Sequence, residues 1–151
     1  MTPEEFTIKL NRMATETNAV INNALPVIVG KKAVDFFQEG FQNEGFTDSN
    51  LEPWQEVKRR QNPKTKGAAS SRKILTGATG DLGESIQYTP GTAEVTIHSD
   101  KPYAEAHNEG TTTAGRNNNV TIPARPFIKE SAELNKIITE EIERKLGEIF
   151  M

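Results

Sequence analysis

The sequence lacks cysteine altogether, and this absence excludes several kinds of chemistry. Without a thiol, the chain forms no disulfide, no thiolate metal site and no cysteine nucleophile. Hydrophobic residues are also scarce, at 34%, and no apolar run reaches the about 18 residues that a membrane-spanning helix needs. We therefore expect a modest core, no membrane segment, and a fold that gains part of its burial from other subunits.

The net charge of -3 disfavours a dedicated nucleic-acid binder, whose usual footprint is strongly basic. The charges are nevertheless unevenly distributed, because every charge in residues 35–56 is acidic and every charge in residues 57–80 is basic. This pattern suggests that, in a head-to-tail ring, the basic segment of one subunit meets the acidic segment of the next. The candidate intersubunit contacts are Lys58, Arg59, Arg60, Lys64, Lys66, Arg72 and Lys73 on one side and Glu44, Asp48 and Glu52 on the other.

Helical signals dominate both ends of the chain. Thr2, Pro3 and Glu5 have the spacing of a helix start with a capping box. An apolar stripe at three- and four-residue steps then predicts one inward face, formed by Phe6, Leu10, Met13, Thr17, Val20 or Ile21, and Ala24. Pro26 should end or kink this helix near Leu25 and start a second one.

A last helix is expected after residue 127, with its own apolar stripe at Leu134, Ile138, Ile142, Leu146 and Ile149. Charge pairs at four-residue spacing, Glu140 with Arg144 and Glu141 with Lys145, should support this helix.

The middle of the chain predicts a small antiparallel sheet. Residues 79–86 read as a short helix that leads into a strand ending near Tyr88, and Pro90-Gly91 reads as a turn. Residues 93–99 alternate between apolar and polar side chains and predict the returning strand. After a short helical turn over residues 101–109, we expect a polar hairpin tip at residues 111–119 and a strand at residues 120–122.

Together these signals predict an α+β fold in a single domain, residues 1–151, with two N-terminal helices and a C-terminal helix packed on a small, mainly antiparallel sheet. Residues 45–50 have turn composition, and the basic segment, residues 58–73, has no apolar periodicity. We expect the basic segment to be a mobile surface loop.

Four stretches, taken in order, resemble the phage virion morphogenesis family, which includes tail completion proteins of Mu-like and related tailed phages. They are residues 54–60 (WQEVKRR), 74–86 (ILTGATGDLGESI), 102–110 (PYAEAHNEG) and 122–127 (IPARPF). We call them the four family stretches. Their structural motif residues are Trp54, Thr79, Gly80, Leu82, Ser85, Tyr103, His107, Gly110, Arg125, Pro126 and Phe127.

The resemblance implies a structural or assembly protein of a phage or prophage tail, made in the bacterial host cytoplasm and located in the tail or neck of the virion. It implies no catalytic residue, no cofactor and no metal. Its implied partners are other tail or connector proteins and further copies of the chain, with a ring as one arrangement.

Two other functions follow from the residues themselves. The basic loop, residues 58–73, would serve a nucleic-acid-binding module if its cations met phosphate, although the stretch has no aromatic residue for base stacking. A small metal-dependent hydrolase would use His107 with nearby candidate ligands, namely His98, Asp100, Glu105 and Glu109. No known zinc-hydrolase spacing accompanies them.

Several motif residues also have plain structural interpretations. His98 would lie on the solvent face of its strand, and His107 would bond the backbone of its own turn. Gly110 would supply a positive φ angle, and Pro126 would fix the start of the last helix. Arg125 is either a rim cation or a buried fork that bonds carbonyl groups or a carboxylate such as Glu109.

Overall fold

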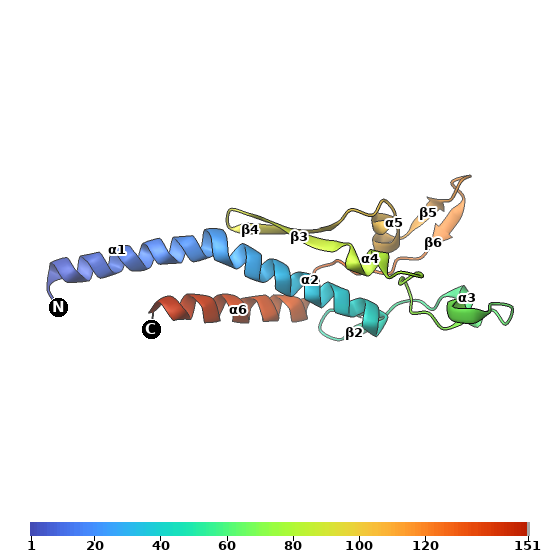
Figure 1. Ribbon diagram of the computed structural model, residues 1–151, viewed down its shortest axis with the longest axis horizontal. Helices are drawn as coiled ribbons and strands as arrows, with labels where there is room; N and C mark the ends of the chain where they lie inside the picture. Colours follow the sequence, from blue (N-terminus) through green and yellow to red (C-terminus); the bar gives the residue numbers. More distant parts are fainter. Residues whose placement is uncertain (151) are drawn as a thin grey trace.

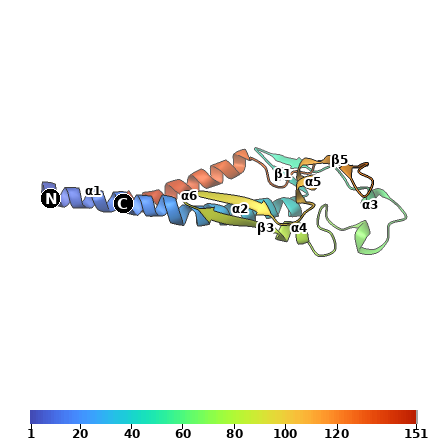
Figure 2. The same cartoon turned by 90° about the horizontal axis from the view of Figure 1, so that it is seen from above.

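The computed structural model describes residues 1–150 and shows an elongated molecule with an α+β fold (Figures 1 and 2). Its long axis is set by three helices: α1 (Pro3–Ala19), α2 (Leu25–Asn43) and α6 (Ala132–Phe150). Short helical segments lie between them: the π-helical turn η1 (Val20–Ala24), α3 (Lys58–Gln61), the 3-10 turn η2 (Gly67–Ser70), α4 (Asp81–Glu84) and α5 (Ala104–Glu109). No helix within residues 1–150 is long and apolar enough to cross a membrane.

The strands form three separate antiparallel hairpins, which corrects the prediction of one small sheet. They are β1 (Gly45–Thr47) with β2 (Leu51–Pro53), β3 (Ile86–Gly91) with β4 (Glu94–Ser99), and β5 (Thr111–Ala114) with β6 (Val120–Ile122). The first hairpin replaces the expected turn at residues 45–50, and β5 occupies the beginning of the expected polar tip. Pro90 and Gly91 are not a turn, because both pair with β4 inside the ribbon.

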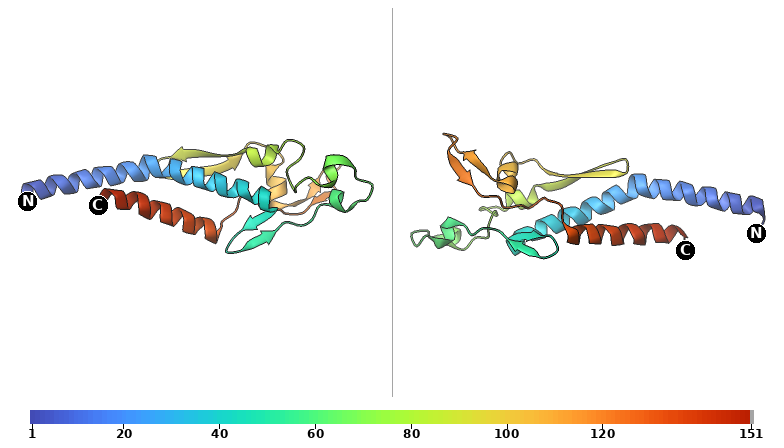
Figure 3. Two further views of the ribbon diagram at one scale, coloured as in Figure 1. Left: turned by 60° about the horizontal axis from the view of Figure 1, so that its bottom comes forward. Right: turned by 180° about the vertical axis from the view of Figure 1, so that it is seen from behind.

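Helix α1 starts as the sequence predicts. The Thr2 side chain accepts a hydrogen bond from the Glu5 amide, and the Glu5 carboxylate accepts one from the Thr2 amide, at 3.1 and 2.7 Å. The helix changes direction between α1 and α2, as predicted for Pro26, and the π-helical turn η1 forms the junction (Figures 1 and 3). Since proline has no amide hydrogen, Asn22 loses its usual α-helical donor, and its carbonyl accepts a bond of 3.3 Å from the Ala93 amide in the β3–β4 turn.

The N-terminal part of α1 does not face inward as predicted. Helix α6 runs alongside α2 and ends short of the N-terminus, so the first turns of α1 project beyond it (Figures 1 and 3). No residue of α1 is buried, and the side chains of Phe6 and Leu10 remain 52% and 49% exposed. Met13 and Thr17, further along the same stripe, are half-buried where α1 passes α6.

Helix α2 is the centre of the fold, with the β3–β4 ribbon on one side and α6 on the other (Figures 1 and 3). The ribbon approaches closely at Gly30, where an added Cβ atom would lie 2.5 Å from Cδ2 of Tyr88. At its C-terminal end, α2 passes through Glu44, which has a left-handed φ of 51°, into the first hairpin. The hairpin, the ribbon and α6 therefore share one scaffold helix.

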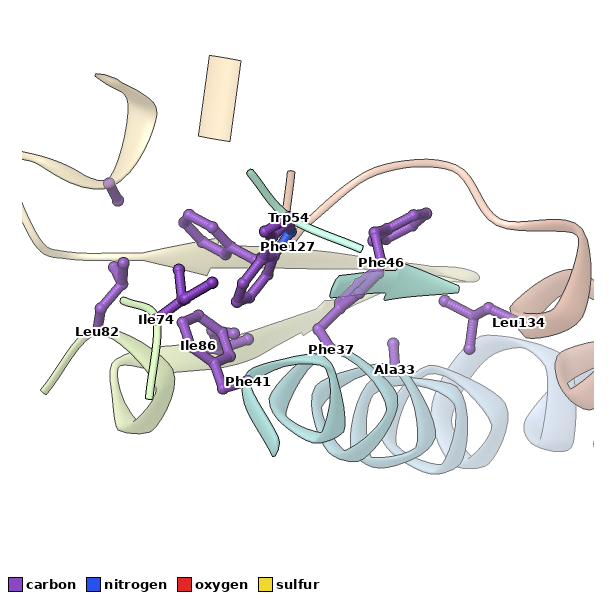
Figure 4. Close-up of a cluster of buried hydrophobic side chains, with 11 residues drawn as sticks. Ala33, Phe37, Phe41, Phe46, Trp54, Ile74, Leu82, Ile86, Phe127 and Leu134 are labelled. Carbon is purple, nitrogen blue, oxygen red and sulfur yellow. The ribbon is translucent and has the colours of Figure 1, made fainter. Parts of the chain in front are cut away.

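An aromatic cluster fills the core next to the C-terminal end of α2 (Figure 4). The ring of Phe41 lies 5.3 Å from that of Trp54 and 5.5 Å from that of Phe127, measured between centroids. Trp54 is buried, and its indole nitrogen donates a 2.7 Å hydrogen bond to the carbonyl oxygen of Pro126. Phe127 is 2% exposed and belongs to the same buried cluster.

The start of α6 is fixed by residues other than Pro126, which lies ahead of it in the chain. Ser131 Oγ accepts a bond from the Leu134 amide and donates one to the Thr47 carbonyl, which caps the helix and ties it to β1. The Asp48 carboxylate accepts a second bond, of 2.7 Å, from the Ala132 amide. The structure thus corrects the role predicted for Pro126.

The ion pairs of α6 also differ from the prediction. Arg144 bonds Glu141 and Glu148, each at 2.9 Å, and Lys145 lies 3.3 Å from Glu148. Glu141 also lies 3.8 Å from Lys32 of α2. Neither predicted four-residue pair forms, because each cation pairs with Glu148 instead.

Candidate functional site

The four family stretches, which are far apart in the sequence, meet at one open pocket of about 560 Å³, which we call the motif pocket. The first stretch contributes Val57 and Arg59, the third Tyr103 and His107, and the fourth Arg125. The second stretch supplies Leu75, Thr76, Gly77, Ala78, Thr79, Asp81 and Leu82. Most of its lining residues come from α3, α4 and α5 and from the turns that precede α4.

Arg125 forms a buried floor of the motif pocket, with only 8% of its surface exposed. Its Nε donates to the Gln55 carbonyl at 2.8 Å and its Nη2 to the Glu56 carbonyl at 3.2 Å. The sequence left open whether Arg125 is a rim cation or a buried fork that bonds carbonyl groups or the Glu109 carboxylate. The structure shows the buried fork, and it bonds carbonyl groups rather than Glu109. Burial lowers the pKa of the guanidinium, and the nearby charge of Glu56 opposes this shift only in part.

His107 brings a neutral imidazole to the same pocket. Burial lowers its pKa, and the positive charge of Arg125 lowers it further. Its Nδ1 atom is buried and has no hydrogen-bond partner among the residues described, so the predicted side-chain bond to its own turn is wrong. The main chain of His107 instead joins the third and fourth family stretches, because its carbonyl accepts a 2.8 Å bond from the Arg125 amide.

Tyr103 forms the outer wall beside His107, with the two rings edge to face at 6.1 Å. The tyrosine is 42% exposed and presents an aromatic surface at the mouth of the pocket. Gly110 ends this segment with a φ of 78°, and a Cβ atom there would lie 2.8 Å from the Ala124 nitrogen. The positive φ predicted for Gly110 is confirmed, and only glycine suits this close approach.

The second family stretch forms the opposite wall through a series of tight turns. Gly80 has a left-handed φ of 72° and donates a 2.7 Å bond to the Thr76 carbonyl, which closes the turn before α4. Leu82 is buried in the core behind the wall. Ser85 Oγ lies 2.6 Å from both the Leu82 carbonyl and Ser99 Oγ, which ties α4 to the β3–β4 ribbon.

One residue that ties the stretches together was missed from the sequence. Asn108 donates a 3.0 Å bond to the Ile128 carbonyl, and its side-chain oxygen accepts bonds from the amides of Phe127 and Ile128. The only sequence signal was its position between His107 and Gly110. This side chain holds the third and fourth family stretches in register.

The predicted metal ligands do not come together. No group of three or more His, Asp or Glu side chains arranged to hold a metal occurs within residues 1–150. His98 Nε2 instead lies 2.8 Å from the hydroxyl of Thr89 across the β3–β4 ribbon. The geometry therefore gives no support to the metal-dependent hydrolase.

The basic segment, residues 58–73, is more structured than predicted, because it contains α3 and η2. Arg59 donates to the carbonyls of Ala69 and Lys73, each at 2.8 Å, and so closes the segment on itself. Lys73 Nζ donates to the Gln42 carbonyl at the end of α2. These two cations hold the segment in place.

Most of the charges expected to join neighbouring subunits also make contacts inside one chain. Arg60 lies 2.7 Å from the Glu44 carboxylate and 2.8 Å from that of Glu56. Asp48 caps α6, and Glu52 lies 3.7 Å from Lys129. Within residues 1–150, four cations of the segment make neither an ion pair nor a side-chain hydrogen bond: Lys58, Lys64, Lys66 and Arg72.

Comparison with known proteins gives the family. The model of the phage virion morphogenesis family matches residues 9–147, which include all four family stretches, all of α2 and most of α1 and α6. Comparisons with curated proteins and with solved structures gave no match. Since the match covers most of the chain, this protein belongs to the phage virion morphogenesis family and has a structural or assembly role in the phage particle.

Proposed function

We propose that this protein completes the phage tail or joins it to the head, and that it acts by binding neighbouring virion proteins rather than by catalysis. The observation that supports this most directly is the convergence of the four family stretches on the motif pocket. The residues that carry the family resemblance thus build one surface feature.

The chemistry of the motif pocket suits recognition. A catalytic acid–base pair needs two groups within hydrogen-bond reach, and among residues 1–150 the His107 nitrogen Nδ1 has no hydrogen-bond partner. The charged Arg125 is bonded only to carbonyl groups, so its positive charge is not neutralised by a direct carboxylate contact. An acidic side chain or the carboxyl terminus of a neighbouring virion protein would supply the missing negative charge, and Tyr103 would pack against that group.

The experiment is complementation of a phage that lacks the gene. Phage without the protein should accumulate heads and tails that are not joined, seen by electron microscopy, and should yield few infectious particles. The wild-type gene should restore the yield. The double variant Tyr103→Ala/His107→Ala should not, even when the purified variant unfolds at the same denaturant concentration as the wild type.

A matched control is Lys136→Ala, which removes an exposed side chain outside the motif pocket and should complement fully. Normal particle numbers from the phage that lacks the gene would contradict the role in tail completion. Full complementation by the pocket variant would contradict the role of the motif pocket.

The four cations for which residues 1–150 supply no ion pair or side-chain hydrogen bond support a second candidate, a contact with DNA at the neck. Lys58, Lys64, Lys66 and Arg72 would each displace counterions from phosphate. A filter-binding assay with duplex DNA at several salt concentrations would test it. Affinity that falls steeply with salt, and that is lost when these cations are replaced, would favour this second function.

A further inference from the structure

The projecting part of α1 carries an apolar stripe that is left about half exposed by the described residues, 1–150. Phe6 and Leu10 are about half exposed, although they continue the stripe whose later members Met13 and Thr17 are half-buried beside α6. An isolated helix of this length is marginal in water, and most helices owe their stability to packing of the apolar face. The stripe therefore continues an existing interface past the point where α6 ends.

An open apolar groove of about 310 Å³ lies elsewhere on the same chain, between the turn of the β3–β4 ribbon and α6. Its base comes from η1 and α2, and its sides come from the ribbon turn and from α6. Ile21, Glu94, Ile138 and Leu146 are among the residues that line it. We call it the helix groove.

The stripe and the helix groove match in length. Phe6 to Met13 spans about 10 Å of helix, and Ile138 to Leu146 spans about 12 Å, at 1.5 Å per residue. They cannot meet within one chain, because η1, whose Ile21 lines the groove, continues directly into α1, and α1 extends away from α2 (Figure 1). A second copy of the chain can bring the two together.

We propose that the N-terminal half of α1 in one subunit docks in the helix groove of a second copy of this chain. Charge favours the same occupant, because Lys9 flanks the stripe and Glu94 lines the groove. The contact uses a different surface on each partner, so it is head to tail and leaves one stripe and one groove unoccupied at the ends of every dimer. Repetition of such a contact gives a closed ring when the rotation permits, or otherwise an open filament.

The test uses two double variants of the full chain. Phe6→Asp/Leu10→Asp removes the stripe and leaves the groove intact, whereas Ile21→Asp/Leu146→Asp blocks the groove and leaves the stripe intact. By sedimentation velocity, the wild type should form an assembly larger than a dimer, and each variant alone should be a monomer. An equimolar mixture of the two variants should form a one-to-one dimer and stop there, because only one competent stripe and one competent groove remain.

The matched control is Ile8→Asp, on the opposite face of α1, where the isoleucine is 68% exposed. It should sediment as the wild type does. Circular dichroism of every variant checks that the helices are retained. A wild type that is monomeric, a stripe variant that assembles normally, or a mixture that stays monomeric would each overturn the proposal.

A charge-swap pair gives an independent check that does not depend on apolar substitutions. Lys9→Glu and Glu94→Lys should each raise the dissociation constant about two- to fivefold at low salt, the range of an exposed ion pair. Together they should restore it. An additive effect of the two substitutions would show that the two side chains do not meet and would overturn the docking geometry. The proposal concerns self-association only, so these measurements stand apart from particle assembly in the phage.

Discussion

The indole N–H of Trp54 donates a 2.7 Å hydrogen bond to the carbonyl oxygen of Pro126, 72 residues further along the chain. This bond joins the first and the fourth family stretches in the core. It places the ring of Trp54 against Phe41, so that polar and apolar contacts converge on one side chain. Arg125, the chain neighbour of Pro126, lines the motif pocket.

Trp54→Phe should lower the free energy of unfolding by about 1–3 kcal/mol, because the substitution leaves the Pro126 carbonyl without its donor. Urea unfolding followed by circular dichroism measures the change. Tyr103→Phe is the control, since it removes a polar atom from an exposed ring and should change stability by about 0.5 kcal/mol or less. Equal stability of the two variants would show that the indole bond contributes nothing.

Arg125→Lys should destabilise the protein by about 2–4 kcal/mol, because a single ammonium group cannot reproduce the two directed bonds to the carbonyls of Gln55 and Glu56. Chemical denaturation gives the change in unfolding free energy. If Arg125→Lys is as stable as the wild type, the planar fork is not what holds the first family stretch in place.

The lowered pKa of His107 predicts a pH dependence of stability. In the unfolded chain the imidazole titrates near its usual value of 6.5, whereas in the folded chain burial and Arg125 keep it neutral at lower pH. Below pH 6.5 the unfolded state therefore binds more protons than the folded state, so stability falls as the pH is lowered through this value. Unfolding free energies between about pH 5 and 8 should show this fall in the wild type and much less of it in His107→Gln. A parallel pH profile in the variant would assign the dependence to other groups.

Gly30→Ala should destabilise the protein by about 1–3 kcal/mol, because the added methyl group overlaps the ring of Tyr88 at the α2–ribbon contact. Gly147→Ala is the matched control, since Gly147 is also in a helix and nothing lies within 4 Å of the position of its added Cβ atom. There the same substitution should stabilise by about 0.5–1 kcal/mol. Melting temperatures of the two variants that shift in the same direction would contradict the close packing at Gly30.

Charge reversal separates the cations that fold the basic segment from those available to a neighbour. Lys64→Glu/Lys66→Glu should leave thermal stability unchanged and should weaken self-association and its salt dependence, if the segment meets an acidic surface of the next subunit. Arg60→Glu should instead lower the melting temperature, because Arg60 pairs with Glu44 and Glu56 within the chain. Sedimentation at several salt concentrations, with a thermal melt of each variant, distinguishes the two effects. Unaltered association of the lysine variant would remove this segment from the intersubunit contact.

The features that the sequence predicted well are those encoded within a few residues. The capping box of Thr2 and Glu5, the stripe of α6 and the positive φ of Gly110 all depend on near neighbours, and the structure shows each of them. The Pro90 turn was mispredicted because every strand of a two-stranded ribbon is an edge strand, where proline is tolerated.

The features that the sequence did not predict depend on distant partners. Asp48 caps a helix 84 residues away, and Glu44 accepts the Ile74 amide as well as Arg60, so neither is available in the way that its position in an acidic run suggested. The periodicity of α1 also indicated an inward face without indicating that α6 would stop before reaching Phe6. For the motif pocket, the sequence identified the four family stretches but did not predict that they meet. Their meeting depends on contacts between residues that are far apart in the chain.

The π-helical turn η1 determines which way the projecting stripe faces. Each residue of an α-helix turns the chain by about 100°, so the removal of one residue from this turn would rotate Phe6 and Leu10 by roughly a quarter of a revolution around the axis of α1. The number of residues between Ala19 and Leu25 thus sets the direction in which Phe6 and Leu10 face around the axis of α1. Pro26 and the hydrogen bond from the Ala93 amide to the Asn22 carbonyl fix the conformation of this turn. An insertion or deletion here would keep Phe6 and Leu10 in the chain but turn them away from the direction that the proposed docking in the helix groove requires.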